Sequence, residues 1–474
     1  MRKRRVPIGV VIALMAITAT LTLTLTYQYA MNSFNDQVKN VAERQKMYGR
    51  LYQIDNRVRD YFLFPVDDAA MFDAIAEGYV NGLKDNGTKY LPQSLCLKTQ
   101  QQIQGLESGI GMEIAMYGTT RAVVTRVIHS GPAQLAGVQA GDFLVGINDI
   151  VLDDTWTLER IEKLLAGDAG TELILKVQRT NEEGIPEDLT FTLTRREYET
   201  QTVTYRIIEG LGYVRIYSFN ERTDEEFREA LVSLVNTGIN GLIIDVRNNG
   251  GGVMESAAAI ADTLLPAGTI VSYSGRDGVK KPMYISDGGQ TDLPLAVLIN
   301  QNSASASEML AAAVQDYNKG RIVGVQSYGK GTVQELHTFS DGSGLYLTTA
   351  YFYPPFSSSF HGVGITPDIK VEMSYTGSLD LLDETTDLQL SAAVNLLNQS
   401  GQFAPVDPEL PTTSDGASSD ETASGDSASG DASSGEDTTS GNTSSDAASS
   451  GESASSASSQ VIGYAEGCSD CIRS

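Results

Sequence analysis

Strand-like and helix-like segments alternate between residues 205 and 370, and this alternation limits that part of the chain to a mixed α/β core. Leu295 to Ile299 is a short, continuous apolar run of the kind found in buried strands. Ala306 to Tyr317 has the composition of a helix, and Arg321 to Val325 again resembles a strand. The first strand-to-helix corner therefore carries a serine cluster, which consists of Ser303, Ser305 and Ser307.

Ser305 allows two interpretations. With Glu308 it matches the S-x-x-E capping box, in which the serine only caps the helix that follows. Lys330 favours a catalytic role, because it lies in a Gly-Lys-Gly turn that a strand, a helix and a returning strand could bring beside Ser305. A lysine removed from water can act as the base that a serine nucleophile needs. The chain has three histidines, none in a recognisable nucleophile motif, so a Ser-His-Asp triad has few candidates: His129, His337 and His361.

The same lysine also ends a G-x-x-x-x-G-K pattern that begins at Gly324 and resembles a phosphate-binding P-loop. Gly331 follows where a P-loop has the serine or threonine that binds magnesium, and the next residues are strand-like rather than helical. The sequence therefore argues against nucleotide binding.

Three motifs are long and ordered enough to suggest a family. Asn302 to Glu308 reads N-S-A-S-A-S-E, Tyr328 to Gln334 reads Y-G-K-G-T-V-Q, and Gly364 to Asp368 reads G-I-T-P-D. With these motifs the chain resembles the C-terminal processing peptidases, also called tail-specific or carboxyl-terminal proteases. The resemblance implies a crotonase-like, ClpP-like α/β peptidase core, with Ser305 as nucleophile, Lys330 as general base and Gln334 as the residue that orients the lysine.

Three consecutive glycines, 250–252, follow the strand-like Gly241 to Val246 and open a helical segment. Such glycines can present backbone amides to an anion, as stabilisation of a tetrahedral oxyanion requires. The alternatives are a flexible turn or a dinucleotide-binding loop, although the sequence does not match the G-x-G-x-x-G pattern of such loops. The family resemblance implies that the amides of Gly251 or Gly252 and of Ala306 form the oxyanion hole.

A second domain is expected before the core. Ser108 to Ile114 reads S-G-I-G-M-E-I and resembles the glycine-rich loop of PDZ domains, a resemblance that continues through residues 131–142. Two glycines let backbone amides converge on a terminal carboxylate, while the next strand pairs with the bound peptide. The expected partners are proteins or peptides with free C-termini, and the expected binding residues are Gly109, Ile110, Gly111 and Met112.

The N-terminus indicates a membrane anchor. Four basic residues precede Val6 to Thr26, which is free of charge and, as a helix, about 31 Å long, enough to cross a bilayer. We expect an uncleaved single-pass anchor in the cell membrane, with a cytoplasmic N-terminus and an extracytoplasmic catalytic domain; a cleaved signal peptide is the alternative. Phe34 to Tyr61 reads as an amphipathic helix that serves either as a homodimerisation arm or as packing for its own domain.

The C-terminal region differs in composition from the rest of the chain. Residues 405–460 are rich in Ser, Gly, Ala and Thr, with eleven acidic residues and no Lys or Arg, so we expect a disordered, self-repelling tether. Its removal is expected to leave catalysis unchanged. Cys468 and Cys471 form a lone C-x-x-C, too few ligands for zinc, so we predict no metal and no cofactor. The net charge of −26 argues against a nucleic-acid partner.

Together these observations predict five regions: a basic flank and anchor (1–30), a helical region (31–104), a PDZ domain (105–196), a serine peptidase core (197–404) and an acidic tail (405–474). The predicted function is that of a membrane-anchored serine endopeptidase with a Ser-Lys dyad. The alternatives are a catalytically inactive PDZ scaffold, which the intact dyad residues argue against, and an acyl-CoA enzyme, which would leave the PDZ pattern without a purpose.

Overall fold

The computed structural model describes residues 8–38, 41–118, 120–289, 291–375, 378–399 and 460–464. The chain divides into two units, residues 1–76 and 77–474, each of which is described by itself. The predicted basic flank at residues 1–5 and the C-x-x-C at residues 468–471 lie outside the described residues.

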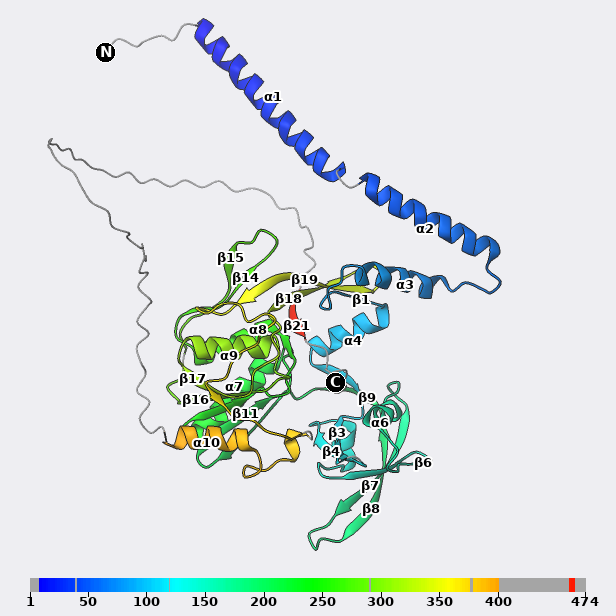
Figure 1. Cartoon of the computed structure of the whole chain (residues 1–474), viewed down its shortest axis with the longest axis vertical. Helices are drawn as coiled ribbons and strands as arrows, with labels where there is room; N and C mark the ends of the chain where they lie inside the picture. Colours follow the sequence, from blue (N-terminus) through cyan, green and yellow to red (C-terminus); the bar gives the residue numbers. More distant parts are fainter. Residues whose placement is uncertain are drawn as a thin grey trace, which may run out of the picture. The chain divides into compact units, whose positions relative to one another are not determined.

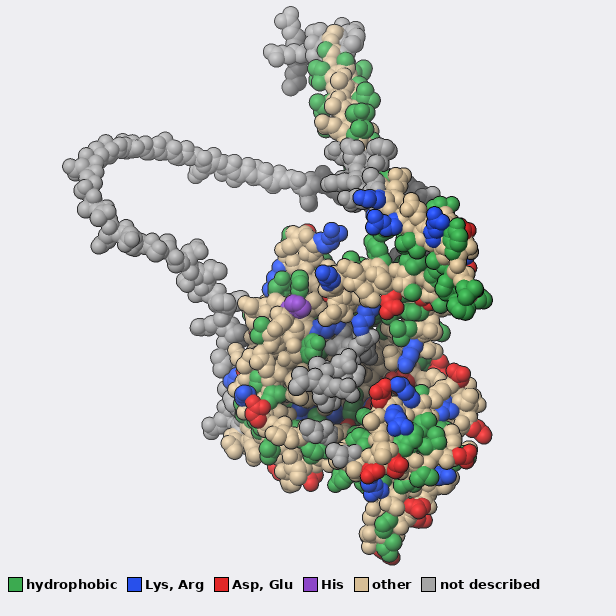
Figure 2. Space-filling model, turned by 45° about the vertical axis from the view of Figure 1, so that its right-hand side comes forward, with side chains coloured by type: hydrophobic (Ala, Val, Ile, Leu, Met, Phe, Trp, Pro, Cys, Tyr) green, Lys and Arg blue, Asp and Glu red, His purple; other side chains and the backbone are tan. Residues whose placement is uncertain are grey.

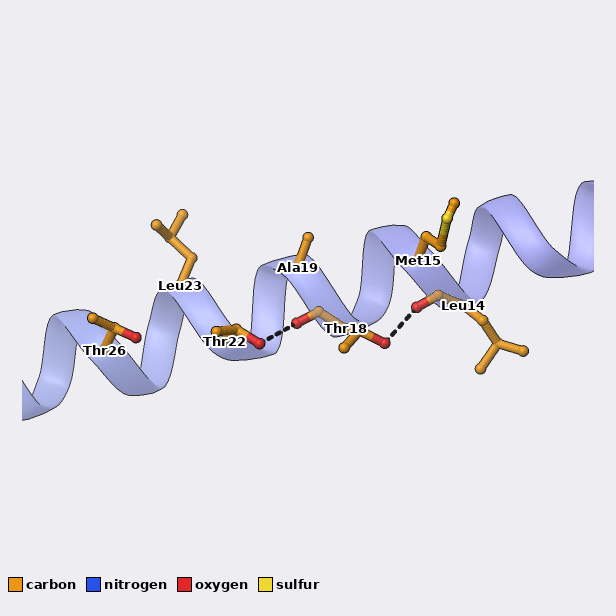
Figure 3. A pocket seen from close by; sticks show the side chains of 7 residues that line it. All are labelled: Leu14, Met15, Thr18, Ala19, Thr22, Leu23 and Thr26. Atoms are coloured by element: carbon orange, nitrogen blue, oxygen red, sulfur yellow. Dashed lines mark hydrogen bonds between the residues drawn. The ribbon is translucent and has the colours of Figure 1, made fainter. Parts of the chain in front are cut away.

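The first unit is helical. It contains α1 (Ile8–Val38), α2 (Val41–Tyr61) and the start of α3 (Asp68–Asn81). In α1, Thr18 and Thr22 donate hydrogen bonds to the carbonyl oxygens four residues earlier (Figure 3). Apolar side chains are exposed along this helix (Figure 2). No helix of the described residues is long and apolar enough to cross a membrane; the predicted span, residues 6–26, begins outside them.

The second unit begins with a small β domain. A sheet in the order β3-β4-β5-β7-β8, with β6 beside β5, encloses an apolar core against α6, whose Ile161 and Leu165 are buried. A two-stranded ladder of β2 and β9 joins this domain to the rest of the chain. The elements are β2 (Leu106–Gly109), β3 (Met112–Tyr117), β4 (Arg121–Val127), α5 (Pro132–Ala136), β5 (Phe143–Ile147), β6 (Ile150–Val151), α6 (Leu158–Leu165), β7 (Glu172–Thr180), β8 (Pro186–Thr194) and β9 (Arg196–Glu199).

The main sheet has the order β10-β11-β12-β16-β17-β20, with β10 antiparallel to β11 and the other neighbours parallel. Residues of β16 alternate between two apolar clusters: Val297 faces the cluster that contains α7, α8 and α9, and Leu298 faces the cluster that contains α10. Because both faces are covered, the strands are continuously apolar, which explains the runs seen in the sequence. The elements are β10 (Val203–Ile208), β11 (Leu211–Ile216), α7 (Thr223–Asn236), β12 (Leu242–Asp245), α8 (Met254–Leu264), β16 (Leu295–Ile299), α9 (Ala306–Asp316), β17 (Gly320–Gly324), β20 (Ile369–Lys370), η1 (Leu379–Leu381) and α10 (Leu388–Gln399).

A third sheet packs against this core in the order β13-β21-β18-β19-β14-β15, and β1 also pairs with β19 (Figure 1). One of its strands, β21, lies in the predicted acidic tail (405–474), for which disorder is expected from the composition of residues 405–460. β21 overlaps that stretch only at Gln460, and residues 400–459 lie outside the part of the chain that the structure describes. The elements are β1 (Lys89–Leu91), α4 (Gln93–Ile103), β13 (Gly251–Val253), β14 (Gly268–Ser274), β15 (Lys280–Ser286), β18 (Thr332–Thr338), β19 (Gly344–Tyr353) and β21 (Gln460–Tyr464).

Candidate active site

Ser305 lies at the corner between β16 and α9 and is fully buried. Its backbone has φ +56° and ψ −112°, a conformation that disfavours any residue with a Cβ. The hydroxyls of its neighbours are used in structure, since Ser303 Oγ donates to Val246 O at 2.8 Å and Ser307 Oγ donates to Asn249 O at 2.9 Å. Ser305 Oγ has no hydrogen-bond partner among the described residues. Of the three serines, Ser305 is therefore the one with a hydroxyl free to react.

Glu308 joins this corner to the loop that carries Lys330. Its Oε2 accepts hydrogen bonds from Ser305 N (2.9 Å) and Lys330 N (2.8 Å). Its Oε1 accepts from Ser327 Oγ and Gly329 N, both at 2.6 Å. Burial raises the pKa of the Glu308 carboxyl, and these four donors oppose that effect. The carboxylate thus fixes the serine and lysine backbones to one point, a role that the capping-box pattern alone did not reveal.

Lys330 is largely removed from water, and this desolvation lowers the pKa of its ammonium group to about 8. This pKa is the net result of several effects: the positive charge of Lys89 also lowers it, while Asp85 and Glu308 raise it. A lysine with this pKa is neutral in a useful fraction of molecules near neutral pH, so it can accept a proton. The structure therefore gives Lys330 the electrostatic environment of a general base.

Gln334 is buried in β18, four residues beyond Lys330. Its side-chain amide donates to Thr348 Oγ1 at 3.5 Å, and a side chain at Gly87 would collide with its Nε2. Thr88 Oγ1 in turn accepts a hydrogen bond from Thr348 N at 3.1 Å. The segment that precedes β1 therefore packs around Gln334, and Lys89, the first residue of β1, lies near enough to Lys330 to affect its pKa.

The predicted oxyanion glycines have different hydrogen-bonding states. Gly251 N donates to Asn249 Oδ1 at 2.9 Å, so this amide is already engaged. Phe219 N donates to Gly251 O, and Val253 N donates to Phe219 O. Because amides alternate along a strand, Gly252 N points away from Phe219, toward the other edge of β13. A Cβ at Gly252 would lie 2.0 Å from Phe219 O, so only glycine fits. Gly252 is the better donor of the two, and Ala306, the first residue of α9, has the second suitable amide.

A buried ion cluster holds the backbone just before the glycines 250–252. Arg247 is almost fully buried, and its guanidinium donates to both carboxylate oxygens of Asp245 and of Asp387. Tyr213 Oη also donates to Asp245 at 2.8 Å. The cluster ties the loop before β13 to the start of α10. The D-V-R sequence directly after a buried strand could have indicated it, but Asp387 lies too far along the chain to be paired by inspection.

In the small domain, the predicted carboxylate-binding residues form the link between β2 and β3. Gly109 ends β2 and Met112 begins β3. Between them, Ile110 O accepts from Ala133 N at 2.8 Å and Gly111 O accepts from Ile128 N at 2.9 Å, which fixes the loop. A Cβ at Gly111 would lie 2.9 Å from the Gly131 Cα. β3 is the edge strand of its sheet and contacts α6, so it leaves one edge available to pair with a peptide.

Comparisons with known proteins agree with this architecture. Residues 210–371 match the model of peptidase family S41, and residues 123–179 match that of the PDZ domain. The chain is 32% identical over 341 residues to a carboxy-terminal-processing protease of Bartonella bacilliformis, covering 70% of this chain and 77% of that protein. It is 31% identical over 328 residues to the chloroplastic C-terminal processing peptidase of Tetradesmus obliquus, covering 65% of this chain and 69% of that protein.

A solved structure has a similar fold. A putative S41 protease from Bacteroides fragilis, 19% identical, aligns with a TM-score of 0.53 over 72% of this chain and 91% of that one. The fold and the sequence matches define a serine-type peptidase of family S41 with a PDZ domain. Within that class, the chain belongs to the carboxyl-terminal processing protease family.

Proposed function

We propose that this protein is an endopeptidase in which Ser305 and Lys330 form a catalytic dyad. The observation that carries the proposal is the hydroxyl of Ser305, which has no partner among the described residues and lies at a strained backbone corner. Glu308 binds the backbone amides of both Ser305 and Lys330, and Lys330 has a lowered pKa. Neutral Lys330 takes the proton of Ser305 Oγ as this oxygen attacks the scissile carbonyl. The amides of Gly252 and Ala306 stabilise the oxyanion.

As the tetrahedral intermediate collapses, the Lys330 ammonium gives its proton to the leaving amine, which departs as the new N-terminus of the C-terminal fragment. The N-terminal fragment stays attached to Ser305 Oγ as an ester through its carbonyl carbon. Water then attacks the ester, with Lys330 again accepting the proton, and releases the acyl fragment and Ser305. Gln334 holds the surroundings of the lysine fixed during both steps. No step needs a cofactor.

Substrates are selected by their C-termini in this proposal. The amides of the loop from Gly109 to Met112 receive the terminal carboxylate, and the free edge of β3 pairs with the last residues as an added strand. The support for this assignment is the position of the loop at the start of an edge strand that faces α6.

The test uses the full chain and an unfolded reporter protein. Ser305→Ala and Lys330→Ala should each reduce kcat/KM by roughly 10⁴-fold or more, and the double variant should be no worse than either, because the two residues act as one unit. Gln334→Ala should retain weaker activity. Substantial turnover by Lys330→Ala would contradict the dyad.

Two matched variants control this test. Ser307→Ala removes a hydroxyl that is equally buried but already donates to Asn249 O, which also accepts from Ala304 N. Lys319→Ala removes another lysine whose pKa is lowered by burial and whose ammonium donates to Thr291 O. Both variants should keep kcat within about threefold of the wild type, since each loses one structural hydrogen bond of about 1 kcal/mol.

We also propose that the chain is attached to the cell membrane through residues 6–26, places its catalytic domain outside the cytoplasm and self-associates through its N-terminal helices. The support is the uncharged stretch behind four basic residues and the exposed apolar side chains of α1. Membrane fractionation and chemical cross-linking of the full chain and of a variant lacking residues 1–30 test these points. A full chain that is found only in the supernatant would contradict the anchor.

A further inference from the structure

The strand β21 lies between two strands that carry candidate site residues, Gly252 in β13 and Gln334 in β18. It runs antiparallel to β13 on one side and to β18 on the other, and Figure 1 draws it in red beside β18. Gly463 is opposite Gly252, and Ile462 is opposite both Val253 and Gln334. In the sheet order β13 and β18 are not neighbours, since β21 separates them. A segment from the end of the chain therefore completes this sheet.

Without β21 the same sheet would contain a slot. Adjacent strands lie about 4.8 Å apart, so β13 and β18 are separated by roughly 9–10 Å, the width of one inserted strand. Both facing edges carry backbone amides and carbonyls that need partners. Any extended peptide can supply such partners through its own backbone, largely independently of its sequence. The slot is thus a binding site for an extended segment.

The walls of this slot carry the catalytic groups. β13 contains Gly252, whose amide points toward β21, and β18 contains Gln334 and begins two residues after Lys330. Ala304 N, next to Ser305, donates to Asn249 O at 3.0 Å, which holds the nucleophile corner to the residues before β13. A peptide in the slot would pass the oxyanion donor at the point where Gly463 now lies.

We propose that residues 460–464 are a built-in occupant of the substrate slot and compete with peptide substrates for it. The inference rests on the proposed function, since the slot belongs to the substrate only if Ser305 is the nucleophile. It also opposes the expectation from composition that the tail does not affect catalysis. The tail then acts as an inhibitor in cis, and substrates gain access in the fraction of molecules from which β21 has left.

The tether makes this competition effective even if the strand binds weakly. About 60 residues separate the end of α10 from β21, and a Gly/Ser-rich linker of that length has a root-mean-square reach on the order of 45 Å. Such a linker gives an effective concentration on the order of millimolar. A segment with a dissociation constant of about 1 mM in trans would therefore occupy the slot in roughly half of the molecules or more.

Disulfide trapping tests the occupancy without relying on catalysis. Glu335 and Val461 are directly opposite each other, at a separation that suits a disulfide. In a chain carrying Cys468→Ser, Cys471→Ser and Ser305→Ala, the pair Glu335→Cys and Val461→Cys should form a disulfide on mild oxidation, detected by peptide mass spectrometry. The matched control replaces Val461→Cys by Ser449→Cys, earlier in the tail, and should cross-link far less. Equal cross-linking of both pairs would overturn the proposal.

Kinetics of the Ser305 enzyme then test the competition. Ile462→Pro removes a backbone donor at the residue that pairs with both walls, so it should lower the apparent KM for a short peptide by about twofold to tenfold and leave kcat unchanged. Ser449→Pro is the control and should match the wild type. An unchanged KM for Ile462→Pro would overturn the competition. If no variant cleaves any peptide, the proposed function fails, and the disulfide result alone decides whether β21 fills the slot.

Discussion

The role of Glu308 can be tested by changing one atom. In Glu308→Gln an NH₂ group replaces one carboxylate oxygen, and each oxygen now accepts two hydrogen bonds. In either orientation of the amide, its NH₂ group therefore faces two groups that are themselves hydrogen-bond donors. Two lost charge-assisted bonds are worth about 3–6 kcal/mol, and relief of the buried charge offsets part of this, since burial raises the pKa of Glu308. We expect a net loss of about 3 kcal/mol, or roughly 6–12 °C in Tm.

The catalytic effect should exceed the effect on stability. The bonds from Gly329 N and Lys330 N hold the lysine loop against the serine corner, and a displacement of about 1 Å at a catalytic group can cost on the order of 10²-fold in rate. We expect kcat/KM to fall by about 10²-fold. The assay is peptide cleavage well below the Tm of the variant, with near-UV circular dichroism to establish that the protein is folded.

Glu226→Gln provides the matched control. Glu226 is another largely buried carboxylate with a pKa raised by burial, and its donors, Thr202 N, Val203 N and Thr202 Oγ1, all bind the same oxygen. An amide oxygen can keep all three bonds, so this variant should lose less than about 1.5 kcal/mol of stability and keep kcat/KM within threefold. The reasoning is refuted if Glu308→Gln keeps kcat/KM within threefold, or if Glu226→Gln loses as much activity.

Three further predictions follow from the site. If neutral Lys330 is the base, as proposed, kcat/KM should rise about tenfold per pH unit below pH 8 and level off above it, because its pKa is about 8. Lys89→Gln should then move this midpoint to higher pH, since it removes a like charge, and a flat profile between pH 6.5 and 9 would contradict the assignment. Amidation of a substrate's C-terminus should weaken binding and cleavage if the loop from Gly109 to Met112 reads the carboxylate, and equal cleavage of both peptides would exclude that reading. Arg247→Lys should cost at least about 3 kcal/mol in urea denaturation, because one ammonium cannot serve two buried carboxylates as the guanidinium does, and a loss below 1 kcal/mol would be inconsistent with the observed ion cluster.

Local sequence patterns predicted those features of the fold that depend on residues close together in the sequence. The continuous apolar run at Leu295–Ile299 and the helix that follows were foreseen because burial on both faces leaves a clear signature. The S-x-x-E pattern indicated a helix that begins at Ser305, but it did not indicate that the Glu308 carboxylate binds Ser305 N, Gly329 N and Lys330 N. The last two donors are about 20 residues away, and only the folded chain brings them to the carboxylate.

The strand β21 was missed for a related physical reason. Composition reports how much apolar surface a segment can bury, and the tail as a whole has little. Pairing between strands depends instead on backbone groups, which every residue except proline offers, and on a free edge elsewhere in the fold. The edges in this case belong to β13 and β18, more than 100 residues before β21. The domain boundaries and the catalytic roles of Ser305, Lys330 and Gln334 stay predictions, which the proposed variants test.

The backbone conformation of Ser305 has a consequence for protein engineering and for natural variation. At φ +56° and ψ −112° a Cβ is strained by about 1–3 kcal/mol, and glycine would be free of this strain. Ser305→Gly should therefore be inactive and yet melt at a higher temperature than the wild type, the reverse of what most buried substitutions do. A screen that selects only for thermal stability would drive the chain toward loss of its proposed nucleophile, so stabilised variants of this protein must be selected for activity at the same time.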